Sequence, residues 1–200
     1  MTKLFLATNN QGKLVEIQAL LGDLDLELLT PDQLGINLQV EESGQTYMEN
    51  AARKGRAFAS ASGLLTLADD SGLEVDALKG MPGVYSARFS PLPNTTDADR
   101  RTYLLTQLSG MPHPWTARFR CLVALVTPQG AVSFTEGVCP GEIIPQERGA
   151  NGFGYDPIFL LPELGRTMAE LSMDEKNLLS HRARAIRAAR PILESLISQP

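Results

Sequence analysis

A short apolar run that passes through a polar turn into a helical pattern opens this chain, in KLFLATNNQGKLVEIQALL. Leu4 to Ala7 is brief and continuously apolar, which is typical of a buried strand. After the polar residues 8–12, apolar side chains recur at helical spacing at Leu14, Ile17, Leu20 and Leu21. A strand that leads through a turn into a helix is the repeating unit of α/β proteins, so this feature favours that class.

The rest of the chain continues the alternation. Strands are predicted over residues 64–68, 118–126 and 131–135, with the last two joined as a hairpin, and helices over residues 47–60 and 97–108. Ser172 and Glu175 have the spacing of a capping box that opens a C-terminal helix, which Pro191 should kink or interrupt. The pattern predicts a mixed α/β sheet, and the length suits one domain over residues 1–200, either simple or with two lobes around a cleft.

Composition excludes several classes of function. Hydrophobic residues make up 43% and charged residues 20% of the 200 residues, as in an ordinary globular protein. The net charge of −5 gives no basic surface for a nucleic-acid polymer. The apolar run near the N-terminus is too short for a signal peptide, and no stretch is long enough to span a membrane. We therefore expect a cytoplasmic protein without a membrane or nucleic-acid partner.

The turn after the first strand is a candidate anion site. The first turn of a helix presents free backbone N–H groups and the positive end of the helix dipole, which favour a phosphate. Lys13 in that first turn opposes the dipole, and a bound anion would remove the conflict. The structural alternative is a simple N-cap by Asn9 or Asn10. The spaced glycines of a P-loop are missing.

Two adjacent carboxylates, Asp69 and Asp70, follow the apolar run 64–68 in the motif ADDSG. Hydrolysis of a phosphoanhydride needs a divalent cation and a carboxylate that orients or deprotonates water. Alternation along the strand puts Asp69 on the leucine-rich face and Asp70 on the smaller, more polar face, so Asp70 is the better candidate. The alternative is a capped turn, and we expect Ser71 and Gly72 to form a turn in either case. The pair Glu41-Glu42 could supply a further metal oxygen.

A glycine-rich segment, GANGFGYDPIF, carries two aromatic residues in a polar loop. Phe153 and Tyr155 are expected to be exposed there, and such a ring could stack on a nucleobase. The alternative is a turn whose Phe packs inward. Further on, Arg182 could donate to the 6-keto oxygen of a purine, with Lys176 about one and a half turns earlier on the same helix. Alone, these residues would be a basic helix face.

Five motifs taken together resemble those of the inosine triphosphate pyrophosphatase family. They are LATNNQGKLVEI, EESGQTYMENAARKGRA, LADDSGLEVDALKGMPGVYSARFS, GFGYDPIF and EKNLLSHRARA, and they extend from Lys3 to about Arg187. Residues 91–116 match no functional motif. The resemblance implies an elongated, two-lobed α/β fold with a long central mixed sheet flanked by helices, a nucleotide-binding cleft and a homodimer.

The activity implied by the resemblance is Mg²⁺-dependent hydrolysis of ITP, dITP, XTP and dXTP to the monophosphate and pyrophosphate, which cleans the nucleotide pool. It assigns catalysis to Asp70, Lys13 and Lys54, and the metal to Glu41 and Asp70. Substrate contacts fall on Thr8, Asn9, Asn10, Gln11, Gly12, Lys13, Lys54, Ser71, Phe153, Gly154, Tyr155, Asp156, Lys176, His181 and Arg182. Two alternatives stay open: a related pyrophosphatase that prefers pyrimidine or modified bases, and a nucleotide-binding protein without catalysis.

Overall fold

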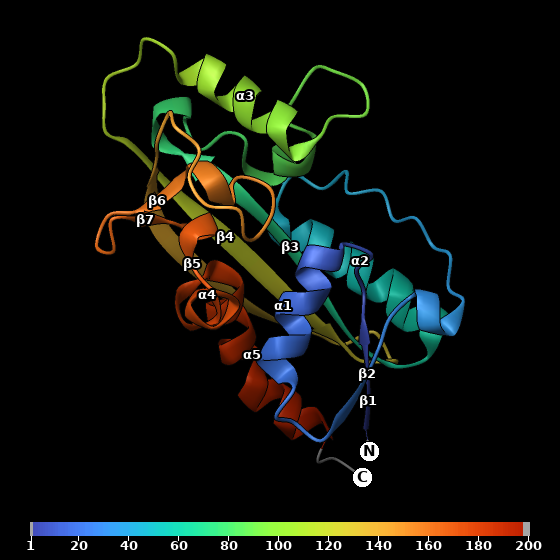
Figure 1. The fold of residues 1–200 in the computed structure, drawn as a ribbon. Helices are drawn as coiled ribbons and strands as arrows, with labels where there is room; N and C mark the ends of the chain where they lie inside the picture. Colours follow the sequence, from blue (N-terminus) through green and yellow to red (C-terminus); the bar gives the residue numbers. More distant parts are fainter. Residues whose placement is uncertain (1, 198–200) are drawn as a thin grey trace. The chain divides into compact units, whose positions relative to one another are not determined.

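The computed structural model describes residues 2–197, and its sheet within those residues is mixed (Figure 1). The strands are β1 (Thr2–Leu6), β2 (Leu26–Leu29), β3 (Leu65–Val75), β4 (Trp115–Val126), β5 (Val132–Ile143), β6 (Phe159–Leu161) and β7 (Arg166–Thr167), in the order β2-β1-β3-β4-β5-β6-β7. β1 pairs in parallel with β2 and β3, whereas β6 pairs antiparallel with β5 and β7. The predicted α/β class with a mixed sheet is confirmed.

Five α-helices accompany the sheet in the described part of the chain. They are α1 (Gln11–Leu21), α2 (Tyr47–Ser62), α3 (Asp97–Leu108), α4 (Met173–Leu179) and α5 (His181–Ile197). The chain divides into two compact units. The first unit takes the described residues of 1–70, 121–137 and 181–200, and the second unit takes 71–120 and 138–180. β3, β4 and β5 contribute residues to both units.

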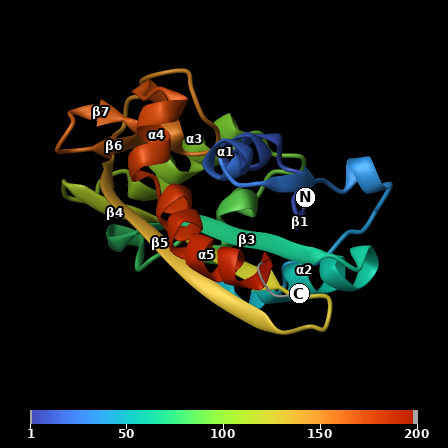
Figure 2. The same ribbon diagram turned by 90° about the horizontal axis from the view of Figure 1, so that it is seen from below.

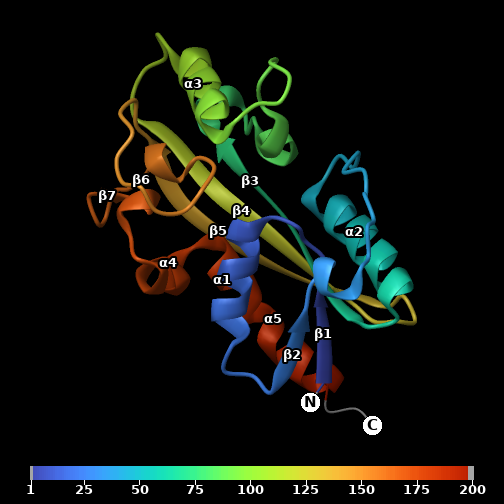
Figure 3. The same ribbon diagram turned by 45° about the vertical axis from the view of Figure 1, so that its right-hand side comes forward.

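In the first unit, alternation along β1 sorts side chains between two helical layers. Leu4 and Leu6 join a core with α1 and α5, where Ile17 and Ile186 are fully buried. Phe5 points to the opposite face and stacks on Phe58 of α2, with ring centroids 5.5 Å apart. Figure 3 shows α1 and α5 on one side of β1 and α2 on the other. Period-two alternation therefore gives β1 two apolar faces, as expected of a strand covered on both sides.

The beginning of α5 is held closely against β5 (Figure 2). The Thr135 hydroxyl donates to the Ala185 carbonyl oxygen at 2.8 Å. At Gly137 an added Cβ would lie 2.1 Å from the His181 carbonyl oxygen, so a larger residue cannot fit without moving the backbone. This contact fixes where α5 presents its first residues.

The second unit has its own apolar core. Leu104 and Leu108 of α3 are fully buried in it, together with Leu73 of β3. Phe119 packs on Phe159 with ring centroids 4.3 Å apart. The predicted α3 limits, 97 and 108, agree with the structure, because Thr96 and Asp99 form a capping box that starts the helix there.

The turn predicted at ADDSG is wrong. Asp69, Asp70, Ser71 and Gly72 all lie inside β3, which continues to Val75. The pairing of β1 with β3 ends at Leu6 and Leu67, whereas β4 is the other neighbour of β3 in the sheet. Tertiary pairing has overridden the turn preference of Asp, Ser and Gly. The two carboxylates therefore lie on a strand just beyond the end of β1.

The single C-terminal helix predicted from Ser172 onward is also wrong. The capping box of Ser172 and Glu175 is present and opens α4, but α4 stops at Leu179. Ser180 is extended, with ψ 157°, and α5 begins at His181 with Pro191 inside it. Lys176 and Arg182 consequently belong to different helices and to different units.

Candidate active site

The predicted anion loop lies where β1 leads into α1. Asn10 is the N-cap, and its side-chain oxygen accepts the Lys13 backbone N–H at 3.0 Å. The Asn10 backbone N–H in turn donates to the Thr8 hydroxyl at 3.2 Å. No acidic residue occupies the first turn of α1, so the dipole there keeps its positive end. The N-cap alternative is thus correct, and it leaves an anion site at this helix end open as well.

Asp69 is the centre of a buried ion cluster in the first unit. Its side chain is 1% exposed, and one carboxylate oxygen, Oδ2, contacts Lys13 Nζ at 3.0 Å and Arg182 Nη2 at 3.2 Å. Nη1 of the same Arg182 donates to the carboxylate of Glu16, which is also buried. Two cations and two carboxylates therefore compensate one another out of water, as buried charges require.

This cluster keeps Asp69 ionised. Burial opposes the charge, but the cations of Lys13, Arg182 and Lys54 outweigh it and hold the pKa of Asp69 well below its ordinary value. Arg182 is buried too, and Asp69 and Glu16 raise its pKa. Cys121 Sγ lies 3.8 Å from Asp69, and burial raises the pKa of that thiol to about 12. Cys121 is therefore an unreactive thiol.

Asp70 is on the opposite face of β3 and has a different environment. It is 5% exposed and accepts a hydrogen bond from Asn50 Nδ2 of α2 at 2.9 Å. Burial raises the pKa of Asp70, and the lowering effects of Asn50 and Lys13 do not cancel it. Neighbouring carboxylates thus have pKa shifts of opposite sign, an arrangement typical of sites that separate a structural ion pair from a proton acceptor.

A second lysine, Lys54, extends from α2 into the same unit. Its Nζ contacts the Glu42 carboxylate at 2.5 Å. Burial disfavours its charge, but Asp69 and Glu42 raise the pKa of Lys54 above its ordinary value. Glu41, the predicted metal ligand, has an exposed side chain instead, and its carbonyl oxygen accepts from Arg53.

Two residues of this arrangement, Glu16 and Asn50, were missed from sequence, and Glu42 was named only as one of the pair Glu41-Glu42. Asn50 lies one helical turn before Lys54, so its spacing places both on one face of α2, which was a usable signal. Choosing between Glu41 and Glu42 was not possible, because they lie in an irregular segment without periodicity. The burial of Glu16 depends on Arg182, which is 166 residues away in the sequence.

This set of donor atoms offers few carboxylate ligands for a divalent metal ion. Among residues 2–197, no group of three or more His, Cys, Asp and Glu side chains is arranged to hold a metal ion. Mg²⁺ does not need one, since it is commonly bound by one or two carboxylates together with water and substrate phosphates. Asp70 suits it because burial penalises its charge, and a cation would offset that penalty.

The predicted base-side loop lies in the second unit. Asp156 is 3% exposed and its Oδ2 contacts Lys176 Nζ at 2.6 Å and the Phe153 backbone N–H at 3.0 Å. Lys176 Nζ also lies 5.1 Å from the centre of the half-buried Phe153 ring, as in a cation–π contact. The exposed position predicted for Tyr155 is wrong: it is 5% exposed, and its hydroxyl donates to the Ser86 carbonyl oxygen at 2.9 Å.

The structure divides the predicted site residues between the two units. Ser71, half-buried on β3, belongs to the second unit, as do the loop Phe153–Asp156 and Lys176. His181 is 5% exposed at the start of α5 and belongs to the first unit with Arg182. The first unit also holds the other predicted residues, namely Thr8, Asn9, Asn10, Gln11, Gly12, Lys13, Glu41, Lys54 and Asp70.

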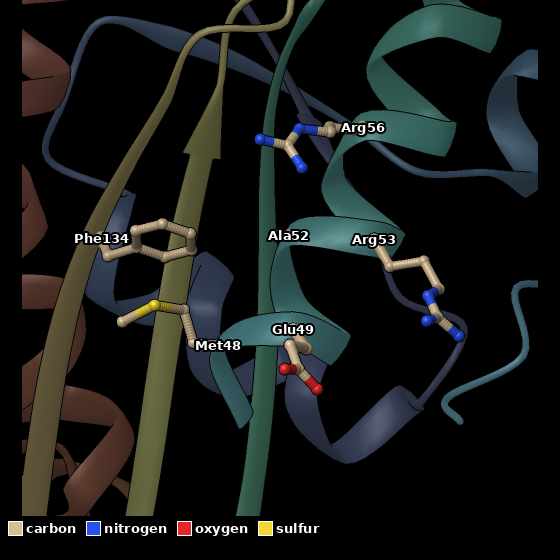
Figure 4. Close-up of a pocket in the computed structure, with 6 residues that line it drawn as sticks. All are labelled: Met48, Glu49, Ala52, Arg53, Arg56 and Phe134. Carbon is tan, nitrogen blue, oxygen red and sulfur yellow. The ribbon is translucent and has the colours of Figure 1, made fainter. Parts of the chain in front are cut away.

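A cavity of about 480 Å³ also lies in the first unit, beside α2 (Figure 4). Its lining residues are Met48, Glu49, Ala52, Arg53, Arg56 and Phe134. Lys54, Asp69 and Asp70 do not line it. The charged cluster, and not this cavity, is therefore the candidate active site, because only the cluster combines perturbed carboxylates with buried cations.

Two lysines and a carboxylate of raised pKa lie near the end of β1 in a mixed α/β sheet. This arrangement is typical of the class of α/β proteins that carry out phosphate chemistry. The chain belongs to the Ham1 family, whose profile matches residues 4–192. This confirms the family membership that the five motifs predicted.

Relatives with nearly the same length support this membership. The dITP/XTP pyrophosphatase of Desulforamulus reducens is 47% identical over 195 residues, which cover 97% of this chain and 96% of the relative. The protein of the same name from Geobacter sulfurreducens is 48% identical, with 93% and 94% covered. The structure of a HAM1 protein from Coxiella burnetii has a TM-score of 0.88 and 41% identity, with 98% of this chain and 100% of that one covered.

Proposed function

We propose that this chain hydrolyses non-standard purine nucleoside triphosphates, ITP, dITP, XTP and dXTP, to the nucleoside monophosphate and pyrophosphate. The observation that carries the proposal is the pair Asp69 and Asp70, adjacent in sequence but differently placed: Asp69 contacts Lys13 and Arg182, whereas Asp70 accepts a hydrogen bond from Asn50 on the other face of β3. One holds the cations of the site, and the other has the raised pKa of a proton acceptor. The names of the relatives, dITP/XTP pyrophosphatase, agree with this chemistry.

In the reaction, the first turn of α1 and the amino groups of Lys13 and Lys54 bind the triphosphate oxygens. Asp69 orients Lys13 through the contact of 3.0 Å. Asp70, fixed by Asn50, accepts the proton of a water that attacks the α-phosphorus, and pyrophosphate leaves. These roles match those assigned to Lys13, Lys54 and Asp70 by the family resemblance.

We further propose that Mg²⁺ is the cofactor. Asp70 would hold it together with a carboxylate of the pair Glu41-Glu42, and the half-buried Glu42 is favoured because Glu41 faces solvent. Bound Mg²⁺ supplies positive charge to the phosphate oxygens. Removal of divalent ions with a chelator should abolish turnover, and Mg²⁺ should restore it.

Selection of the base is proposed to rest on the loop Phe153–Asp156, on Lys176, and on His181 and Arg182. Phe153 offers a ring face, and the loop offers backbone groups. Arg182 is already bonded to Glu16 and Asp69 and is 1% exposed, so we assign it first to the charge of Asp69 and only second to the base.

A homodimer and a cytoplasmic location remain predictions from the resemblance and the sequence. In the described part of the chain, every helix is too short or too polar to cross a bilayer. Size-exclusion chromatography with light scattering would measure the oligomeric state directly.

One assay tests the proposed activity. Pyrophosphate release is measured with ITP, XTP, dGTP, dTTP and ATP in the presence of Mg²⁺, for the wild type, for Asp70→Asn and for Asp23→Asn as a matched surface control. Preference for ITP and XTP, lost in Asp70→Asn and kept in Asp23→Asn, is the expected result. Preference for dTTP would support the pyrimidine alternative, and tight binding without turnover would support a non-catalytic protein.

A further inference from the structure

The N-terminal turns of α3 hold the loop Phe153–Asp156 at a single residue, Gly154, an arrangement that we call the grip. Gly154 donates its backbone N–H to Asp97 Oδ2 at 2.8 Å and accepts Arg101 Nη1 on its carbonyl oxygen at 2.8 Å. Asp97 and Arg101 are four residues apart, so they share one face of the helix. The backbone N–H and C=O groups of Gly154 are thereby both bonded to one helix, α3, which is yellow-green in Figure 1.

Each gripping side chain is itself held. The other oxygen of Asp97 accepts from the Arg100 guanidinium, which also donates to the Thr95 carbonyl oxygen at 2.8 Å. Arg101 is 13% exposed and forms a two-pronged pair with Glu147 at 2.8 and 3.0 Å. Planar bidentate pairs of this kind fix the guanidinium geometry, so the third donor of Arg101 is aimed at Gly154 in advance.

The loop Phe153–Asp156 and the residue before it contain glycines, whose backbone can adopt many conformations unless other contacts restrain it. Gly152 and Gly154 have positive φ angles of 74° and 61°, in the region that glycine enters without a steric penalty. At Gly154 nothing lies within 4 Å of an added Cβ, so the positive φ, and not a lack of space, is what favours glycine there. The hydrogen bonds to Asp97 and from Arg101 restrain the backbone at this residue.

Next to Gly154 lie the groups proposed to contact the base. Phe153 precedes it and carries the ring above which Lys176 Nζ lies. Asp156, two residues later, binds both Lys176 and the Phe153 N–H. A change in the backbone conformation at Gly154 would move the Phe153 ring relative to this pair.

We propose that Asp97 and Arg101 are positioning residues for base selection, acting through the backbone N–H and C=O groups of Gly154. This gives a function to part of the segment 91–116, which matches no functional motif. The inference rests on the proposed function in one respect, the role of the Phe153 loop in contacting the base. The helix α3 is then a support for specificity as well as a cover for the core.

Hydrogen exchange tests the grip without reference to activity. In Asp97→Ala and Arg101→Ala, the segment 149–156 should exchange faster than in the wild type. The matched control is Asp99→Ala, which removes the capping box of the same helix but has no bond to Gly154. Equal acceleration in all three variants would mean that the loop responds only to helix stability, and would overturn the grip.

Kinetics tests the consequence. The ratio of kcat/KM for ITP to that for ATP is measured in the same variants, in Phe153→Ala and in Asp97→Asn. Loss of one such hydrogen bond should lower the ratio about tenfold in Asp97→Ala and Arg101→Ala, mainly through KM for ITP. Asp97→Asn, which keeps an acceptor for the Gly154 N–H, should recover most of it, and Asp99→Ala should match the wild type.

The outcomes separate the two proposals. If the wild type prefers ITP and Phe153→Ala loses that preference while Asp97→Ala and Arg101→Ala keep it, the positioning role is wrong and the proposed function stands. If the wild type hydrolyses ITP and ATP equally, the proposed function fails and base selection by α3 fails with it, whereas the exchange data still report on the grip.

Discussion

The two units of this protein fix their functional groups by different means. In the first unit the fixed elements are charges: Lys13, Arg182 and Glu16 surround Asp69, and all but the lysine are almost fully buried. In the second unit the fixed element is a backbone, a loop with positive φ angles held by Asp97 and Arg101. Ion pairs hold the groups of the first unit, which suits phosphate chemistry, whereas hydrogen bonds to the backbone hold the loop of the second unit, which suits selection of a planar base.

The comparison predicts that loss of a charged group in the first unit affects turnover, and that loss of a loop contact or ring in the second unit affects the choice of substrate. Asp70→Asn is the most severe test. Removal of a proton acceptor should lower kcat by about 10²–10⁴-fold, measured as pyrophosphate release from ITP. The free energy of unfolding should stay the same or rise, because burial disfavours the ionised Asp70 and the amide carries no charge. Undiminished turnover would remove Asp70 from the mechanism.

Asp69→Asn should have the complementary effect on stability. It leaves Arg182 and Lys13 without their shared carboxylate in a buried site, which costs about 3–5 kcal/mol of unfolding free energy. Urea unfolding followed by circular dichroism measures this cost. Asp23→Asn, which breaks an exposed pair with Arg190, is the control and should leave the free energy of unfolding nearly unchanged. Similar values for both variants would show that the buried cluster is not a structural centre.

Lys13→Ala should be milder than either aspartate variant. Loss of one charge-assisted contact to phosphate corresponds to about 1.5–3 kcal/mol, seen as a higher KM and a lower kcat for ITP. Lys3→Ala is a suitable control, since Lys3 forms only an exposed pair with Glu27. A change equal to that of the control would exclude Lys13 from substrate binding.

Phe153→Ala tests the second unit. Loss of a stacking ring should weaken binding by about 1–3 kcal/mol, with the effect in KM and in the preference for ITP over ATP, and kcat nearly unchanged. Steady-state kinetics with both nucleotides gives the two parameters. A fall in kcat with constant selectivity would mean that the second unit, too, contributes to the chemical step.

Local patterns predicted much of this molecule correctly. The α/β class, the capping box of α4 and the opposite faces of Asp69 and Asp70 all follow from periodicity and capping, which act over a few residues. The predictions were wrong where contacts between segments distant in the sequence determine the local structure. The residues of ADDSG are turn formers, yet β3 continues through them, and the helix predicted beyond Ser172 is interrupted at Ser180.

Sequence alone therefore predicted which residues would carry the chemistry, because residue type and spacing along a strand or a helix are local properties. Only the tertiary structure decided their electrostatic state and partners. Asp69 meets Arg182 across 113 residues, and Gly154 meets Asp97 across 57. Burial and charge compensation depend on what folding brings together. That is why two neighbouring residues of the same type, Asp69 and Asp70, have pKa shifts in opposite directions.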